Sequence, residues 1–363
     1  MIMSFRWFGK NEDPIPLAHI CQIPGMKAVV SALSEIPVGE VWPMEAILEL
    51  KRDIEAHGLL FHTIESVNVH EDIKLGLATR DRYIENYRQT LRNLGTAGVK
   101  VVCYNFMPAF DWLRTDLAQT LEDGSNTMAY DENVILGLTP EKLMQSMYEG
   151  SNGFELAGWE KERFGELEKV FALYKAISED KLFEHLGYFL RAIIPAAEES
   201  GIKMAIHPDD PPWPVFGLPR IVTSKENLER IVRLVDSPSN GLAICTGSLG
   251  ANPKNHMPEI IRYFGKMGRL HFGHVRNIKI DRQGVFYETS HKDDCGTIDM
   301  YEVMKAFHDI GFKGPIRPDH GRMIWGEAGR PGYGLYDRAL GAVYLQGLWD
   351  AMERSADSQE MKR

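Results

Sequence analysis

Four side chains that commonly bind transition metals end four short apolar segments in the second half of the sequence. The segments read Lys-Met-Ala-Ile-His207, Gly-Leu-Ala-Ile-Cys245, Leu-His-Phe-Gly-His274 and Gly-Pro-Ile-Arg-Pro-Asp319. A thiolate, two imidazoles and a carboxylate form a mixed set of donors, which suits a divalent transition ion better than magnesium or calcium. The softness of the thiolate by itself favours zinc or iron(II).

The spacing of these residues indicates an open site rather than a closed structural zinc site. They are separated by 38, 29 and 45 residues, whereas structural zinc ligands usually come as close pairs on short loops. A larger coordination shell leaves positions open for a chelating substrate. His271 precedes His274 by three residues, so the two side chains point to opposite faces of a strand, and we favour the later histidine as the ligand.

Each candidate ligand taken alone has a simpler explanation. A histidine at a strand end is often a hydrogen-bonded structural residue, Cys245 could be a small buried hydrophobe, and Asp319 could cap a following helix or turn. The metal interpretation therefore rests on their joint placement at four successive segments.

Polar side chains beside the candidate ligands could bind an anionic, hydroxylated molecule. Arg276 and Asn277 follow His274, and Arg317 precedes Asp319 by two residues. Arg276 has the same strand parity as His274, so we expect it to hold a carboxylate beside the metal. A surface salt bridge is the alternative role for this arginine.

Two further residues could move protons. His320 adjoins the candidate ligand Asp319, and Tyr333 lies in the sequence Pro-Gly-Tyr-Gly. An imidazole and a phenol can each act as acid or base, although a tyrosine in a glycine-rich loop often serves only packing or turn structure.

The elements that must position these residues alternate along most of the chain. The predicted strands are residues 4–8, 27–32, 60–65, 99–106, 203–207, 241–245, 269–276 and 315–319. The predicted helices include 44–57, 80–97, 182–200, 225–235, 257–265 and 300–310. Such alternation implies parallel strands joined by crossover helices.

Eight such units predict a single domain of the α/β class, a closed (β/α)8 TIM barrel over residues 1–354. Active-site groups of these barrels lie at the C-terminal ends of the strands, which is where the candidate ligands fall. A doubly wound open sheet is the alternative. No G-x-G-x-x-G follows the first strand, so its dinucleotide-binding version has little support.

Two segments depart from the alternation. Residues from about 108 to 181, between the fourth and fifth strands, are too many for one crossover. This segment has polar turns at 122–126 and 149–153 and a helix-like stretch at 159–178, and we predict a helical insertion on the catalytic rim. It would act as a lid or an oligomer contact, with packing on the outer wall as the alternative. Residues 355–363 are polar and are predicted to be a disordered tail.

Composition excludes several classes of function. The formal net charge of −10 argues against a nucleic-acid partner, which calls for a basic face, although local basic residues can still hold a small anion. No apolar run approaches the roughly 18 residues that span a bilayer, and residues 1–10 lack a signal-peptide core. The four widely spaced cysteines argue against a disulfide scaffold. We expect a cytoplasmic homo-oligomer with a small-molecule substrate and no membrane partner.

Long and specific motifs are spread over nearly the whole chain. They are Phe5-Arg6-Trp7-Phe8-Gly9, Ile36-Pro37-Val38-Gly39-Glu40-Val41-Trp42, Glu65-Ser66-Val67, Val69-His70-Glu71-Asp72-Ile73-Lys74, Tyr104-Asn105-Phe106-Met107-Pro108, Phe110-Asp111-Trp112, Cys245-Thr246-Gly247-Ser248, His274-Val275-Arg276-Asn277 and Arg317-Pro318-Asp319-His320-Gly321. Together they resemble the mannonate dehydratases of the glucuronate-degradation route.

The resemblance implies a xylose-isomerase-like barrel, a hydro-lyase that removes water from D-mannonate to give 2-keto-3-deoxy-D-gluconate. It implies Mn2+ as the cofactor, and we keep Fe2+, Co2+ and Zn2+ as substitutes. The residues that it implies are the metal ligands His207, Cys245, His274 and Asp319, the acid/base residues His320 and Tyr333, and the substrate contacts Arg276 and Asn105.

Dehydration of a 2,3-dihydroxy acid requires removal of a poorly acidic proton beside a carboxylate. We expect a base to take the C2 proton while an acid helps the C3 hydroxyl to leave as water, with the two roles unassigned between His320 and Tyr333. A sugar or sugar-acid isomerase or epimerase on the same barrel is the alternative, but it would normally use a carboxylate-rich, often two-metal site. A barrel endonuclease would need a basic face, and a silent sugar-acid binding protein would need no proton-transfer pair.

Overall fold

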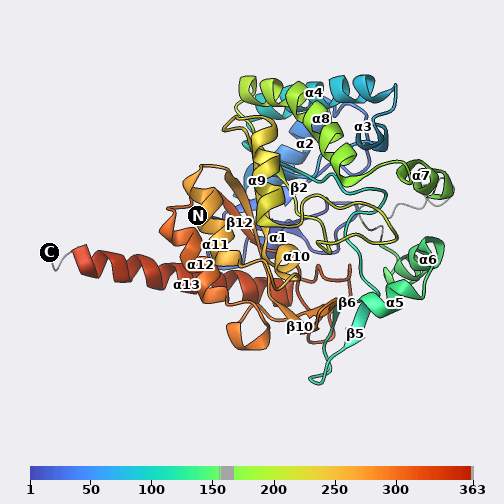
Figure 1. Ribbon diagram of the computed structural model, residues 1–363. Helices are drawn as coiled ribbons and strands as arrows, with labels where there is room; N and C mark the ends of the chain where they lie inside the picture. Colours follow the sequence, from blue (N-terminus) through green and yellow to red (C-terminus); the bar gives the residue numbers. More distant parts are fainter. Residues whose placement is uncertain (155, 157–166, 361–363) are drawn as a thin grey trace.

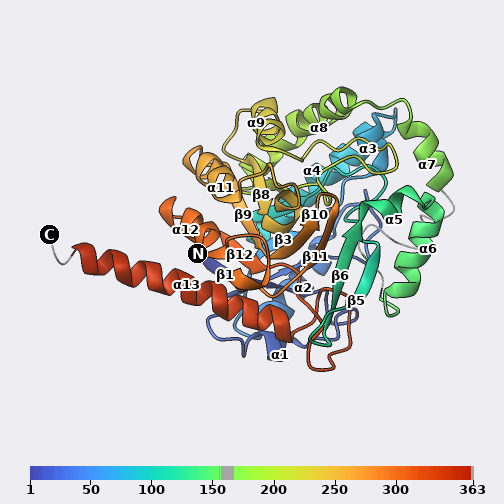
Figure 2. The ribbon, with the colours of Figure 1, turned by 60° about the horizontal axis from the view of Figure 1, so that its bottom comes forward.

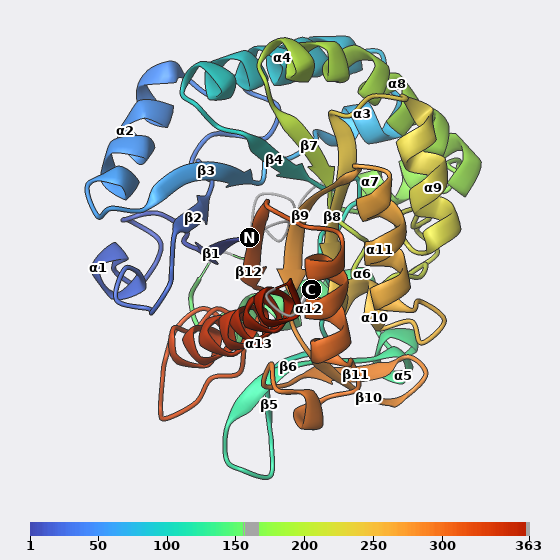
Figure 3. The same ribbon diagram turned by 90° about the vertical axis from the view of Figure 1, so that its left-hand side faces the viewer.

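The computed structural model describes residues 1–154, 156 and 167–360. Its centre is a closed barrel of parallel strands in the order β1-β12-β9-β8-β7-β4-β3-β2, with helices around the outside (Figure 3). The barrel strands are β1 (Ile2–Arg6), β2 (Ala28–Ser31), β3 (Leu60–Glu65), β4 (Val101–Tyr104), β7 (Lys203–Ile206), β8 (Asn240–Cys245), β9 (Leu270–Val275) and β12 (Pro315–Pro318). All eight predicted strands are confirmed, each boundary within two residues.

Small and apolar side chains fill the barrel interior. One buried cluster combines residues of five different strands, namely Val30, Val101, Cys103, Ala205, Ala243 and Phe272. Because these residues pack into a solid layer, the interior is a core rather than a pore, and a ligand must bind at the barrel mouth.

Helices cover the barrel because each has one apolar face. In α2 (Met44–Glu55), for example, Ile47, Leu50 and Ile54 are buried at the helical spacing of three and four residues. The other helices of the outer ring are α4 (Arg80–Thr96), α8 (Glu179–Glu199), α9 (Lys225–Leu234), α11 (Met257–Lys266) and α12 (Met300–Asp309). Short helical turns are α1 (Leu17–Ile20), α3 (Glu71–Leu75), α10 (Thr246–Gly250) and the 3-10 turn Asp293–Cys295.

The predicted helical insertion is a mixture of helices and strands. Its described helices are α5 (Glu132–Leu136), α6 (Pro140–Gly150) and α7 (Leu167–Tyr174), and its strands are β5 (Asp116–Thr120) and β6 (Asn126–Asp131). The expected helix at 159–178 overlaps α7 in part, and its residues 159–166 lie outside the described residues. The insertion therefore contains helices, as the sequence indicates, and also a β-hairpin that the sequence analysis missed.

That hairpin is half of a second sheet. It pairs with a hairpin after β9, formed by β10 (Ile278–Arg282) and β11 (Val285–Glu288), to give the antiparallel order β10-β11-β6-β5. This accessory sheet lies beside the barrel (Figure 2). It carries side chains from β11 toward the barrel mouth, where they meet the candidate site.

The last helix, α13 (Tyr336–Glu360), begins against the barrel and extends away from it toward the C-terminus (Figure 1). It runs through the first six residues of the expected disordered tail, so the structure differs from that expectation; residues 361–363 lie outside the described part. Among the described residues, no helix is both long enough and apolar enough to cross a membrane.

Candidate metal centre and active site

The four predicted metal ligands meet at the barrel mouth. Cys245 ends β8 and is paired in register with His274, the last residue but one of β9, while His207 and Asp319 directly follow β7 and β12. The ligand atoms of His207, Cys245 and His274 all lie within 4.8 Å of one another. Asp319 lies beside them, with Oδ2 3.3 Å from the sulfur of Cys245 and Oδ1 3.8 Å from Nδ1 of His274.

The orientation of these groups fits a bound cation. Nδ1 of His207 lies 2.7 Å from the carbonyl oxygen of Pro208, so it carries the proton and leaves the lone pair of Nε2 facing Nδ1 of His274 at 3.0 Å. The backbone N–H and the hydroxyl of Ser248 donate to the sulfur of Cys245 at 3.3 and 3.0 Å. Two imidazoles, a sulfur and a carboxylate converging in this way match the donor set of a divalent transition ion.

Asp319 is held as a carboxylate by its neighbours. Burial alone would raise its pKa, but the positive charges of Arg317 and Arg276, together with the nearby histidines, outweigh burial and hold the pKa well below its usual range. Nη2 of Arg317 lies 2.7 Å from Oδ1, and Nε of Arg276 lies 2.9 Å from Oδ2. An ionised carboxylate is the form that binds a metal.

The guanidinium of Arg276 is occupied by acidic side chains of the protein. Its guanidinium is buried and forms ion pairs with Asp210 at 2.7 Å and with Glu288, in addition to Asp319. It is also absent from the residues that line the two cavities at the barrel mouth. Arg276 therefore lies beside the candidate metal ligands, holds acidic side chains, and is outside the lining of the cavities in which a carboxylate clamp is expected.

A second arginine completes this buried charge cluster. Arg114, in the loop before β5, forms two contacts with Asp210 at 2.8 and 3.0 Å and one with Glu288 at 2.8 Å. Burial would raise the pKa values of both carboxyls, but the arginines and His320 outweigh it and lower them. Sequence reasoning missed Arg114, Asp210 and Glu288; the only signal was that Asp210 follows His207 by three residues.

His320 and Tyr333 form a hydrogen-bonded pair. Nε2 of His320 lies 2.8 Å from the Tyr333 hydroxyl, and Nδ1 lies 2.7 Å from Oε1 of Glu288. Burial raises the pKa of Tyr333 further than the nearby Arg317 lowers it, so the phenol is protonated at neutral pH. The structure thus brings together the two residues predicted to move protons and adds a carboxylate behind them.

The other predicted substrate contacts divide into two groups. Asn105 and Arg317 line the small cavity at the metal centre, where the Asn105 amide also donates to Asp111 at 3.1 Å. Asn277 is fully buried and bonds to the backbone, donating to the carbonyl of Lys292 and accepting from Ile298. The structure therefore brings Asn105 and Arg317 to the site but uses Asn277 to hold a loop.

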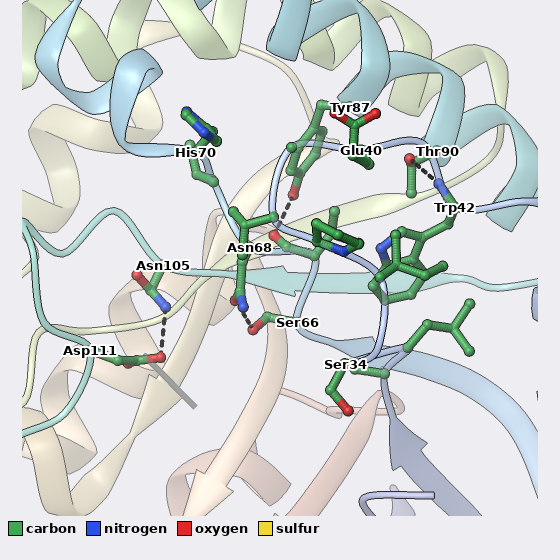
Figure 4. A pocket seen from close by; sticks show the side chains of 18 of the residues that line it. Ser34, Glu40, Trp42, Ser66, Asn68, His70, Tyr87, Thr90, Asn105 and Asp111 are labelled. Atoms are coloured by element: carbon green, nitrogen blue, oxygen red, sulfur yellow. Dashed lines mark hydrogen bonds between the residues drawn. The ribbon is translucent and has the colours of Figure 1, made fainter. Parts of the chain in front are cut away.

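Two cavities with lining residues in common lie at the barrel mouth. The smaller, of about 60 Å³, is lined by His207, Asp319, His320 and Tyr333 among others. The larger, of about 620 Å³, is lined mainly by the segments after β2, β3 and β4 (Figure 4). The cavities share residues that include Arg6, Phe8, Ser66, Asn105 and Asp111. The larger cavity therefore adjoins the candidate metal centre.

The sequence model of the family described as D-mannonate dehydratase (UxuA) matches residues 1–359. The chain belongs to the mannonate dehydratase family. It is 63% identical over 354 residues to the mannonate dehydratase of Thermotoga neapolitana, covering 98% of each chain. It is 59% identical over 360 residues to that of Geobacillus thermodenitrificans, covering 99% of this chain and 97% of the relative.

Solved structures agree with the membership in the mannonate dehydratase family. The mannonate dehydratase of Streptococcus suis serotype 2 superposes with a TM-score of 0.89 at 46% identity, covering 98% of this chain and 95% of that one. D-psicose 3-epimerase of Clostridium cellulolyticum H10 superposes with a TM-score of 0.56 at 13% identity, over 98% and 99% of the chains. The epimerase shares the barrel fold alone, so the comparisons favour the dehydratase family over the isomerase alternative.

Proposed function

We propose that this chain, a hydro-lyase of the mannonate dehydratase family, removes water from D-mannonate to give 2-keto-3-deoxy-D-gluconate, with the reacting end of the substrate in the smaller cavity and the rest in the larger one. The assignment of the reaction to this site rests on one observation. The candidate metal ligands His207 and Asp319 line the same cavity as the hydrogen-bonded pair of His320 and Tyr333. A substrate in that cavity would touch both a Lewis acid and a proton-transfer pair.

His207, Cys245, His274 and Asp319 would hold the metal. We take manganese(II) as the resident ion, with iron(II), cobalt(II) and zinc(II) as substitutes. When bound, such an ion supplies Lewis acidity to the substrate carboxylate and its neighbouring hydroxyl, which makes the C2 hydrogen easier to remove.

His320 and Tyr333 would share the proton transfers. One residue takes the C2 proton and the other protonates the departing C3 hydroxyl, after which the enol becomes the 2-keto acid. Because the two side chains hydrogen-bond to each other, a proton can pass between them and restore the starting state. Glu288 orients the imidazole from behind, and Arg276 and Arg114 hold Glu288 in place.

Arg317 and Asn105 are the proposed substrate contacts. Both line the small cavity, and Arg317 offers a positive charge to a sugar-acid carboxylate. Arg276 and Asn277, which the sequence also indicated, serve instead as positioning residues, because they line neither cavity and their polar atoms bond to protein groups.

The test is to incubate the manganese-loaded protein with D-mannonate and with its C2 and C3 epimers, and to follow the 2-keto-3-deoxy acid by a colorimetric assay and the substrates by chromatography. We expect keto acid to form from D-mannonate at a rate that falls when the metal is chelated and recovers when manganese is restored. Formation of an isomeric aldonate without loss of water would instead establish an isomerase or epimerase and overturn the proposal.

A further inference from the structure

The two ring nitrogens of His274 face different partners. Nδ1 faces Nε2 of His207 at 3.0 Å, inside the group of metal ligands. Nε2 faces the other way, toward Oε2 of Glu65 at 3.4 Å. A neutral imidazole carries one proton, so the partner of Nε2 decides whether Nδ1 has a lone pair available for a metal.

We propose that Glu65 is a positioning residue that fixes His274 in the tautomer with the proton on Nε2 and the lone pair of Nδ1 directed at the metal. The proposal rests on the metal ligands assigned above. Glu65 ends β3, which lies across the barrel from β9 in the strand order, so its carboxylate reaches over the barrel mouth to His274.

Glu65 and His274 each have a buried polar atom that requires a hydrogen-bond partner. In the described part of the chain, Oε2 of Glu65 and Nε2 of His274 are both buried without any hydrogen bond of standard geometry. The ring of His274 is fully buried and contacts the ring of Phe272 edge-on, with 4.3 Å between the ring centroids. This packing limits rotation of the imidazole. A buried N–H and a buried carboxylate oxygen that face each other form a hydrogen bond after a small approach, and leaving them unpaired would be costly.

The other oxygen of Glu65 reaches a second ligand through Arg317. Nη2 of Arg317 lies 3.0 Å from Oε1 of Glu65 and 2.7 Å from Oδ1 of Asp319. One carboxylate therefore orients His274 directly and Asp319 through a guanidinium. His207 is oriented in the simpler way, by the carbonyl of Pro208 at 2.7 Å, and outer partners of this kind tune metal sites in general.

A second role for Glu65 must be separated from this one. The side chains of Glu65, Cys103 and His274 also offer ligand atoms within 4.8 Å of one another, so they could themselves hold an ion. Cys103 belongs to the apolar layer inside the barrel, so its replacement distinguishes the two roles.

The experiment is a titration of the metal-free full-length protein with cobalt(II), against a competing chelator, following the d–d and sulfur-to-cobalt absorption bands. We expect Glu65→Gln to weaken cobalt binding by about 10- to 100-fold and to shift the d–d bands, because one amide oxygen cannot serve both His274 and Arg317. Cys103→Ala should bind cobalt as the wild type does. Cys245→Ala should lose the sulfur-to-cobalt band.

Each outcome decides a different point. Wild-type affinity and spectrum in Glu65→Gln would overturn the positioning role, and a loss of affinity in both Glu65→Gln and Cys103→Ala would make Glu65 a ligand instead. An unchanged spectrum in Cys245→Ala would overturn the ligand assignment itself. Thermal unfolding of the metal-free variants checks the fold. If Glu65→Gln does not fold, Glu65→Asp carries the test: its shorter reach toward His274 should also weaken binding, and wild-type affinity would contradict the proposal.

Discussion

Nε2 of His320 lies 2.8 Å from the hydroxyl of Tyr333, so the two groups share one hydrogen bond within the active-site cavity. Replacing His320 by Asn or Tyr333 by Phe should lower kcat by roughly 10²- to 10⁴-fold, the usual contribution of general acid–base catalysis. Steady-state kinetics of the manganese-loaded variants measures this, with metal content confirmed in each.

The same variants can assign the two roles. Exchange of the C2 hydrogen in deuterated water reports proton removal separately from loss of water. Where removal is reversible, the acid variant should keep exchange without dehydration, and the base variant should lose both. Wild-type dehydration in both metal-loaded variants would show that neither residue is catalytic.

The sulfur of Cys245 should be essential for tight metal binding. Cys245→Ser removes the soft ligand and should weaken binding by at least the roughly 10- to 100-fold that loss of an outer partner costs. Metal analysis after dialysis against a chelator measures the effect. Cys21→Ser is the matched control, because Cys21 is exposed and far from the ligands in sequence. Full metal content in Cys245→Ser would contradict the assigned ligand set.

The buried position of Arg276 predicts a stability effect rather than a binding effect. Arg276→Met would leave Asp210, Glu288 and Asp319 short of a positive charge, and should lower the free energy of unfolding by about 3–5 kcal/mol. Denaturant unfolding measures it. Arg282, an exposed arginine 3.5 Å from Asp131, is the control: its Met variant should change stability by about 1 kcal/mol or less.

Arg276→Lys adds a kinetic test of the same assignment. Lysine keeps the charge but cannot contact several carboxylates with one planar group. We expect lower stability and lower kcat with little change in KM. A raised KM with wild-type stability would instead restore Arg276 as the substrate clamp.

His271 should make folding stability sensitive to mild acid. Its side chain is 8% exposed, and burial lowers its pKa to about 4. The folded-state pKa is below the unfolded value of about 6.5, so the unfolded chain binds the proton more readily. The contribution of His271 to the free energy of unfolding is therefore fully present above pH 6.5 and is lost as the pH falls toward 4. The expected loss between pH 7 and pH 5 is about 2 kcal/mol.

Urea unfolding at pH 7 and pH 5 measures this loss. His271→Asn keeps a donor for the carbonyl of Met204, which Nδ1 of His271 contacts at 2.8 Å, and should reduce the difference between the two pH values. His19→Asn, at an exposed position, should leave the difference unchanged. An equal pH effect in His271→Asn and the wild type would show that this histidine does not cause it.

The sequence was sufficient to predict the barrel and to predict that the candidate metal ligands lie close together. Apolar runs of four to six residues marked the strands, and a barrel places every strand end at one mouth, so Cys245 and His274 had to be neighbours. Strand parity also placed Arg276 near the metal. The sequence could not show that Asp210 and Glu288 would hold Arg276 away from the cavities. Asp210 lies in a loop and Glu288 in a hairpin, and the course of such segments cannot be predicted from hydrophobic periodicity.

The accessory sheet was missed for a related reason. β5 and β10 mix polar with apolar residues instead of forming apolar runs, and the pairing of the four strands joins segments far apart in the chain. The four-residue gap 281–284 between two alternating runs, ending in Gly284, was the available sign of the second hairpin. Without the partner hairpin, neither segment has an apolar face that identifies it alone.

The pairing of Arg114 with Glu288 also bears on when the enzyme becomes active during synthesis. The two residues are 174 positions apart, and Arg276 joins the same cluster from a third segment. Contacts of such long range form late, because a large loop must first be closed. In a nascent chain that ends before β11, Arg114 lacks one of its two carboxylate partners, and His320 has not yet been synthesised. We therefore expect the proton-transfer pair to be assembled among the last steps of folding, after the barrel strands that carry the metal ligands have emerged.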